Sequence, residues 1–153
     1  SEEVTEQLKN AVLNRARTHN KKTRIYPCKK DIYEARSKTT DLDVELISLL
    51  MERNIKAVSK GFVLTNDPKL KNHSGFRFDE VQCIGAIKEL IAPCQLILGN
   101  QGYAFVKQNL EKYINYYNDL SVINVEGGHH CHMQSSKECY EHIQAFMVQS
   151  GAR

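Results

Sequence analysis

Three histidines and a cysteine lie at four successive positions near the C-terminus. They belong to the histidine segment Gly127–Met133, which reads GGHHCHM and directly follows a short β-branched run. An imidazole can act as a general acid or base, ligate a metal or hydrogen-bond to loop backbone. The two glycines allow the chain to turn sharply, so that the next side chain faces a crevice. The histidine segment is therefore the first candidate for a functional site.

Metal binding is one hypothesis for the histidine segment. If the segment is extended, His130 and His132 point to the same side, and Cys139 and His142 lie about one helical turn apart further along the chain. Histidine and cysteine are common zinc ligands. The sequence has no second cluster with ligand spacing, so we predict neither a metal site nor another cofactor. A second hypothesis is that the imidazoles only cap the backbone of the loop.

General acid–base catalysis is the hypothesis that we favour. Sites in α/β folds lie at the carboxyl ends of parallel strands, and His129 comes directly after a predicted strand and two glycines. An imidazole in that place can take a proton from a nucleophile and return it to a leaving group. His129 is therefore the candidate catalytic residue.

The residues after position 93 alternate between strand and helix patterns. Cys94–Leu98 is a nearly continuous apolar run that ends in a glycine-containing turn, as in a buried parallel strand, and Ser121–Val125 is β-branched. Tyr103–Leu120 has helical periodicity. Ser135 and Glu138 form an S-x-x-E capping box that opens a last helix. The order strand, helix, strand, helix predicts an α/β unit with a parallel pair.

Before position 93 the sequence predicts helices and connectors. Apolar residues at three- and four-residue spacing indicate three amphipathic helices, which are Val4–Thr18, Asp41–Arg53 and Asp79–Ile91. Thr40 or Asp41 is expected to cap the second helix, and Pro93 ends the third. A polar, basic connector extends from the first helix through Lys30.

The predicted strands raise a question about the sheet. An α/β sheet needs several neighbouring strands and cover on both faces, and two parallel strands do not provide these. Either the helical first part of the chain folds against a two-stranded ribbon, or the remaining strands come from another polypeptide.

Composition narrows the class of protein. The 153 residues are 41% hydrophobic and 25% charged, with a net charge of +3, which is typical of a soluble globular protein. No apolar run approaches the roughly 20 residues of a membrane helix, so no membrane span is expected. The basic excess lies in the first 38 residues, where Tyr26 and Tyr33 are the only aromatic rings of Phe, Tyr or Trp, so we expect no nucleic-acid partner. Five cysteines without a CxxC pair favour reduced thiols in a cytoplasmic protein.

Three segments in order resemble α/β-hydrolases. Gly61–Leu70 contains the D-P-x-L motif that follows the helical cap in a subset of that family, and Ile91–Gly99 resembles the penultimate core strand. Val125–Met133, with the helix that includes Phe146, resembles the C-terminal histidine region. The likeness is greatest to the animal serine hydrolase-like proteins. It implies that residues 1–75 form a helical cap with its return segment and that residues 76–153 form the C-terminal part of an α/β-hydrolase core.

The resemblance also implies site residues. His129 matches the histidine of the catalytic triad, and His130, Tyr103 and Asp67 are expected to line the substrate or ligand pocket. The family commonly places its acid three residues after the strand-end glycine, where this sequence has Gly102. Asp67 is the nearby acid that we consider as a substitute. The G-x-S-x-G motif that carries the nucleophilic serine does not occur in the sequence.

The resemblance thus implies a hydrolase subunit that acts only with a partner. The expected partner is an N-terminal α/β-hydrolase chain that carries the nucleophile and completes the sheet. The expected substrate is a small apolar or ester-like molecule. The alternative is a catalytically inactive protein of the same fold that binds a small apolar ligand, which the glycine at position 102 favours.

Overall fold

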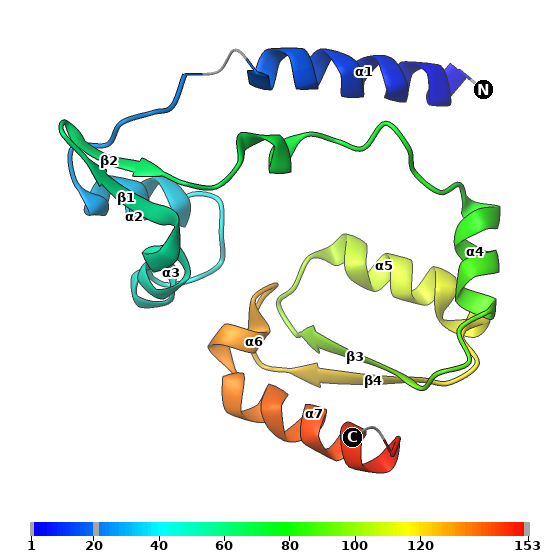
Figure 1. Cartoon of the computed structure of the whole chain (residues 1–153). Coiled ribbons are helices and arrows are strands. Elements are labelled where there is room, and N and C mark those ends of the chain that lie inside the picture. The colour runs from blue at the N-terminus through cyan, green and yellow to red at the C-terminus, as the bar shows by residue number, and fades with distance from the viewer. Residues whose placement is uncertain (1, 20–21, 152–153) are drawn as a thin grey trace. The chain divides into compact units, whose positions relative to one another are not determined.

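The computed structural model describes residues 2–19 and 22–151, which form two compact units (Figure 1). Residues up to 39 and residues 47–78 make up the first unit, and residues 40–46 and those from 79 onward make up the second. Thr40–Leu46 is thus the part of the first 78 residues that belongs to the second unit. The predicted cap includes residue 1 and the predicted core includes residues 152–153, and these three residues lie outside the described ranges.

The first unit begins with helix α1, Glu2–His19, which confirms the amphipathic helix predicted there. The predicted basic connector is shorter than expected, because a helix, α2, spans Lys29–Ser37. Ile32 of α2 is 2% exposed, so one deeply buried apolar residue anchors a helix that is otherwise mostly polar. Helix α3, Val44–Met51, begins in the second unit's residues 40–46 and continues into the first unit, where the 3-10 turn η1, Glu52–Asn54, follows.

An antiparallel hairpin follows in the first unit. Strand β1, Ile55–Val58, pairs with strand β2, Gly61–Leu64. This hairpin was not predicted from the sequence, because each strand has only four residues and its pattern is too short to be recognised. Tyr26 and Phe62 exchange two backbone hydrogen bonds of 2.8 Å. A Cβ on Gly61, which has φ +134°, would overlap the carbonyl oxygen of Tyr26.

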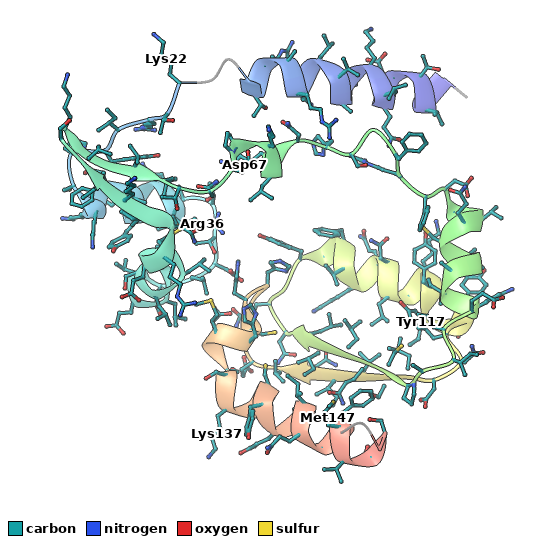
Figure 2. All side chains as sticks on the ribbon, in the orientation of Figure 1. Lys22, Arg36, Asp67, Tyr117, Lys137 and Met147 are labelled. Carbon is teal, nitrogen blue, oxygen red and sulfur yellow. The ribbon has the colours of Figure 1, made fainter. Side chains whose placement is uncertain are left out.

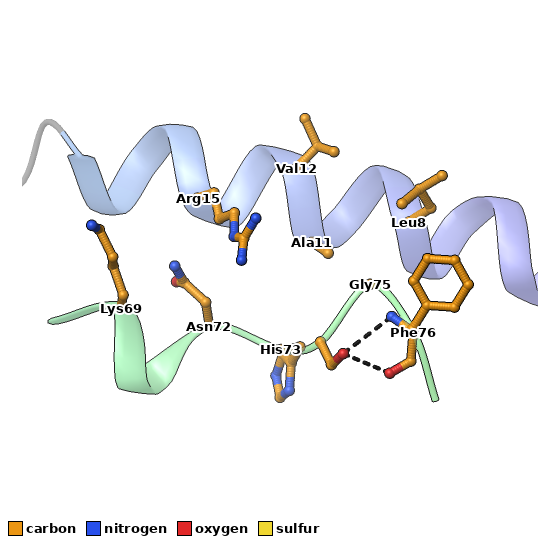
Figure 3. A pocket seen from close by; sticks show the side chains of 10 residues that line it. Leu8, Ala11, Val12, Arg15, Lys69, Asn72, His73, Gly75 and Phe76 are labelled. Atoms are coloured by element: carbon orange, nitrogen blue, oxygen red, sulfur yellow. Dashed lines mark hydrogen bonds between the residues drawn. The ribbon is translucent and has the colours of Figure 1, made fainter. Parts of the chain in front are cut away.

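A groove of about 890 Å³ lies between α1 and the segment that follows the hairpin (Figure 3). Two contacts link its walls. The Thr18 hydroxyl donates to Asn72 Oδ1 at 2.7 Å, and Gln7 Nε2 donates to the carbonyl oxygen of Ser74 at 3.4 Å. Leu8 of α1 lines the groove and remains half exposed, so this face of the helix is only partly covered within the first unit.

The second unit is built on the parallel strands β3, Cys94–Gly99, and β4, Leu120–Val125. Both strands and their parallel pairing confirm the sequence prediction. The other elements described in this unit are α4 (Glu80–Lys88), α5 (Ala104–Tyr113), η3 (Ile114–Tyr116), α6 (Cys131–Gln134) and α7 (Ser136–Gln149). Figure 1 shows α5 and α7 on opposite sides of the strand pair. Within the described ranges, no helix is long and apolar enough to cross a membrane.

The predicted start of α3 is wrong. The Asp43 carboxylate accepts the backbone N–H of Leu46 at 2.8 Å, which is the bond that an N-cap side chain makes. Helix α3 therefore begins at Val44, and neither Thr40 nor Asp41 caps it. This leaves the Asp41 side chain available for a different contact.

The helix predicted over Tyr103–Leu120 is shorter than expected. Helix α5 ends at Tyr113, and the chain tightens into η3 before β4 begins. Asn118, in the turn before β4, donates from Nδ2 to the carbonyl oxygens of Lys88 and Leu90 at 2.9 and 2.8 Å. These bonds satisfy carbonyl groups at the end of α4 and fasten that helix to the start of the strand.

The structure also corrects two predictions around the histidine segment. Ser135 forms no capping box, because its hydroxyl donates to the carbonyl oxygen of Glu126 at 2.8 Å. The segment is not extended, because Cys131–Gln134 forms the short helix α6. His132 lies on that helix. The prediction that His130 and His132 point to the same side assumed an extended chain, so it does not apply here.

The core of the second unit is small. Val125, Cys131 and Cys139 are buried, and Ile97 and Ile123 pack against them. Burial raises the pKa of the Cys139 thiol, and the neighbouring Cys131 thiol adds to the effect. Among the described residues, no cysteine forms a disulfide. Most residues of β3 and β4 are only half buried, so the strand pair retains apolar surface.

Three glycines allow the two strand ends to approach each other. A Cβ on Gly99 would overlap the carbonyl oxygen of Gly128 and would lie 2.5 Å from that of Gly127. The backbone N–H of Gln101 donates to the same Gly127 oxygen at 2.9 Å. Main chain thus packs directly on main chain where β3 and β4 end.

A glycine-to-alanine pair tests this contact. We expect Gly99→Ala to destabilise the second unit by about 3 kcal/mol, the upper end of the usual cost of overpacking, because backbone atoms must move. Gly85→Ala is the matched control. Gly85 lies inside α4, and a Cβ added there would have no atom within 4 Å, so alanine should stabilise the helix by up to about 1 kcal/mol. Urea unfolding followed at the amide signals of β4 measures both, and equal stability of the two variants would contradict the packing.

Candidate active site

A cavity of about 190 Å³ lies at the carboxyl ends of β3 and β4. Its lining includes Tyr103 and His129, two of the residues predicted to belong to the site, together with Gly102 and the apolar Leu96 and Val106. The histidine follows β4 and its glycines, and the tyrosine immediately precedes α5. Both positions follow from the parallel pairing, because the two strand ends meet at one edge.

The His129 ring is available for chemistry. Its centroid lies 4.5 Å from that of Tyr103, with the planes 31° apart. The His130 ring meets it edge-on at a centroid distance of 5.2 Å. The residue is exposed, and in residues 2–19 and 22–151 no side chain hydrogen-bonds to its ring. Both ring nitrogens can therefore exchange protons with solvent or with a bound molecule.

Asp41 holds the backbone at His129. One carboxylate oxygen, Oδ2, accepts the backbone N–H of His129 at 2.5 Å, and the other, Oδ1, lies 3.0 Å from Nδ1 of His130. The side chains of Asp41 and His130 are 32% and 17% exposed, so the contact is partly shielded from water. This role of Asp41 was not predicted, because no local pattern links residues 88 positions apart.

Gln134 closes the turn from the other side. Its Oε1 accepts the backbone N–H of Gly128 at 2.7 Å, and its Nε2 donates to the carbonyl oxygen of Asp41 at 3.3 Å. Gly127 has φ +116°, and a Cβ there would lie 2.8 Å from Gln134 Oε1. A Cβ on Gly128 would overlap the Asp41 carboxylate. The two glycines therefore do more than turn the chain, since they make room for the side chains that fix it.

The Asp41 carboxylate is stabilised in its charged form. Burial by itself would raise the pKa of Asp41, but the hydrogen bonds from the His130 ring and the His129 backbone hold it below the ordinary value. With a carboxylate on Nδ1, the favoured tautomer of His130 carries its proton there. His130 is thus engaged with Asp41 rather than with the cavity.

The remaining predicted positions lie as follows. Asp67 belongs to the first unit, where its Oδ1 accepts the backbone N–H of Lys69 at 2.8 Å and caps the 3-10 turn η2, Pro68–Lys71 (Figure 2). Gly102 lies beside the turn, since a Cβ there would be 3.8 Å from the Gly128 carbonyl oxygen. No carboxylate is present at that position. Among the described residues, no three histidine, cysteine or acidic side chains form a group that could hold a metal.

The larger groove of the first unit offers less chemistry. It is lined by His73 and Ser74, but the Ser74 hydroxyl donates to the carbonyl oxygen of Phe76 at 2.5 Å and accepts its N–H at 3.1 Å (Figure 3). A hydroxyl held by its own loop in both directions is poorly placed to act as a nucleophile. The smaller cavity beside His129 is therefore the better candidate for an active site.

The depressed pKa of Asp41 predicts acid sensitivity of this turn. A carboxylate whose folded pKa is lowered contributes stability that is complete above its unfolded pKa of about 4 and is lost as the pH falls through the folded value. Unfolding of the second unit between about pH 7 and pH 2 should therefore show a larger loss of stability for the native chain than for Asp41→Asn. Parallel pH profiles would contradict the assignment.

Known proteins resemble this chain in fold but not detectably in sequence. No family model and no curated protein matches the sequence. Among solved structures, the hypothetical protein PA1622 from Pseudomonas aeruginosa PAO1 is similar with a TM-score of 0.85 and 20% identity, over 97% of this chain and 54% of that protein.

Two other solved structures have the same arrangement. The thioesterase domain from the curacin biosynthetic pathway has a TM-score of 0.77 and 16% identity, over 92% of this chain and 50% of that domain. E-2-(acetamidomethylene)succinate hydrolase has a TM-score of 0.67 and 20% identity, over 94% of this chain and 53% of that enzyme. The chain thus spans about half the length of the solved structures it matches, and its fold is similar to the α/β-hydrolase fold.

Proposed function

We propose that this chain contributes the cap and the triad histidine to an α/β-hydrolase that cleaves small esters. Residues 1–75 form the cap with its return segment, and residues 76–153 form the C-terminal part of the core. His129 is the general base. The nucleophilic serine comes from an N-terminal α/β-hydrolase chain, because this sequence has no G-x-S-x-G turn.

The observation that carries the proposal is the free ring of His129 at the cavity. Its backbone N–H is bound by Asp41, while its imidazole is exposed beside Tyr103 and lines the space at the strand ends. A general base needs a ring nitrogen that can reach the proton it takes, and the exposed ring of His129 leaves its nitrogens accessible. The similarity in fold to a thioesterase domain and a hydrolase supports the same interpretation.

The reaction would proceed in two acyl transfers. His129 takes the proton of the serine hydroxyl as its oxygen attacks the ester carbonyl, and returns that proton to the leaving alcohol as the C–O bond breaks. Water then attacks the acyl-enzyme, with His129 taking the water proton and passing it to the serine oxygen. Substrate and water are consumed, acid and alcohol are formed, and the imidazole is regenerated.

Two features support a partner that completes the sheet. The residues of β3 and β4 remain mostly half buried in a two-stranded ribbon, and parallel strands are normally buried on both faces within a larger sheet. The structures of similar fold are about twice as long as this chain. An added strand beside the ribbon would cover apolar surface and could bring the serine to His129.

The cavity limits the substrate. At about 190 Å³ it has the volume of roughly six water molecules, and Leu96 and Val106 in its lining are apolar. A short acyl group suits such a space better than a long one. The rest of the substrate would extend toward the partner chain.

A serine-directed probe tests the proposal. A fluorophosphonate should label the serine of the complete two-chain enzyme, and His129→Ala should reduce labelling and aryl-ester hydrolysis by about 10² to 10⁴-fold, the usual contribution of a general base. His73→Ala is the matched control, because His73 is exposed and belongs to the first unit. Hydrolysis by the isolated chain, or full labelling of the His129 variant, would overturn the proposal.

A second candidate function is ligand binding without catalysis. It is favoured by Gly102, which leaves no carboxylate at the position where the family commonly has its acid, and by the absence of any carboxylate on the His129 ring among the described residues. The same experiment separates the two. A complex that retains a small apolar molecule but is not labelled by the probe would be a carrier.

A further inference from the structure

We propose that Asp41 is a positioning residue, which sets the place of His129 by binding its backbone rather than its ring. This inference rests on the proposed function, because it assigns a second residue to the same site. Triad histidines are usually oriented by a carboxylate on the ring nitrogen. Here the Asp41 carboxylate binds the backbone N–H of the histidine instead.

Both carboxylate oxygens of Asp41 are engaged at the turn. Oδ2 accepts the backbone N–H of His129, and Oδ1 faces Nδ1 of the next residue, His130. Two successive residues are thus bound by one planar group, which restricts both the position and the tilt of the turn. Hydrogen bonds to an ionised acceptor are stronger than neutral ones, so the carboxylate is suited to this role.

The surrounding residues leave space for Asp41 and hold it in place. Gly128 lacks the Cβ that would collide with the carboxylate. Gln134 binds both the Gly128 N–H and the Asp41 carbonyl oxygen, so it links the two sides of the turn. The main chain at residues 127–129 is therefore enclosed between two side chains, and removal of Asp41 opens one side.

The charge of Asp41 also suits the proposed reaction. The proposed base becomes an imidazolium during that reaction, and this sequence has Gly102 where the family commonly has its acid. The Asp41 carboxylate binds the backbone N–H of His129 and also lies against the His130 ring. That ring meets the His129 ring edge-on at a centroid distance of 5.2 Å. Asp41 therefore places a negative charge at the main chain of the proposed base without occupying its ring nitrogens.

The place of Asp41 in the chain connects the site to the proposed cap. Asp41 belongs to Thr40–Leu46, the part of the first 78 residues that is compact with the strands. In the proposed division at residue 75, Asp41 falls within the cap sequence. The geometry of the base then depends on a residue supplied by the cap sequence.

Hydrogen exchange of the backbone amides in this chain tests the contact directly. In Asp41→Asn, which preserves size but removes the charge and one acceptor, the His129 amide proton should exchange with solvent at least about tenfold faster. Asp43→Asn is the matched control, because Asp43 lies two residues away and binds the Leu46 N–H instead. That variant should affect Leu46 and leave His129 unchanged. An unchanged His129 amide in Asp41→Asn would overturn the inference.

Kinetics of the complete enzyme test the catalytic consequence. Asp41→Asn should lower kcat for a small aryl ester by about 10 to 100-fold, a range expected when a reacting group shifts slightly, with KM changed less than about twofold. Asp41→Glu keeps the charge and should recover part of the loss, which distinguishes positioning from general unfolding. Asp43→Asn should leave kcat near its original value.

The outcomes separate the two proposals. If the native complex hydrolyses the ester and Asp41→Asn does so equally well, the positioning role is wrong and the proposed function stands. If the native complex neither reacts with the probe nor hydrolyses the ester, the proposed function is wrong, and the exchange measurement alone decides whether Asp41 fixes the turn.

Discussion

The second unit depends on a contact between main chains at the ends of its two strands. Gly99 of β3 packs against the carbonyl groups of Gly127 and Gly128, and the N–H groups of Asn100 and Gln101 bond to the end of β4 and the turn that follows it. No side chain fits between these backbones. The approach therefore brings the residues after β3 and after β4 to one place, and it explains why Tyr103 and His129 share a cavity.

The same absence of side chains lets distant residues reach the turn. The Asp41 carboxylate occupies the space that a Cβ on residue 128 would fill, and Gly127 adopts a positive φ beside Gln134. A glycine pair costs conformational entropy, and here that cost is offset by hydrogen bonds that a larger residue would exclude. The glycines and Asp41 are therefore parts of a single packing arrangement, although the sequence separates them widely.

The sequence predicted elements with a long or strongly apolar pattern and failed where contacts across the chain decide the structure. The helix α1 and the strands β3 and β4 were expected, because their patterns cover enough residues to be recognised. Helix α2 was missed, since one buried residue, Ile32, anchors it. Within the site, His129 and Tyr103 were predicted as site residues, and both line the cavity. Asp41 was predicted, as an alternative to Thr40, to cap a helix. Local chemistry suggested that role, and Asp43 two residues later performs it instead.

The two neighbouring imidazoles have different surroundings, and this difference supports the separate roles that we propose for them. His130 is largely buried and has its Nδ1 on a carboxylate, so moving a proton there would disturb the bond that holds the turn. His129 is exposed, lines the cavity and keeps both ring nitrogens unoccupied among the described residues. A group that must accept and release a proton in each cycle needs a ring that can change charge while its backbone stays fixed. His129 meets that requirement because the Asp41 carboxylate binds its backbone N–H and the neighbouring His130 ring, which fixes the main chain at this turn.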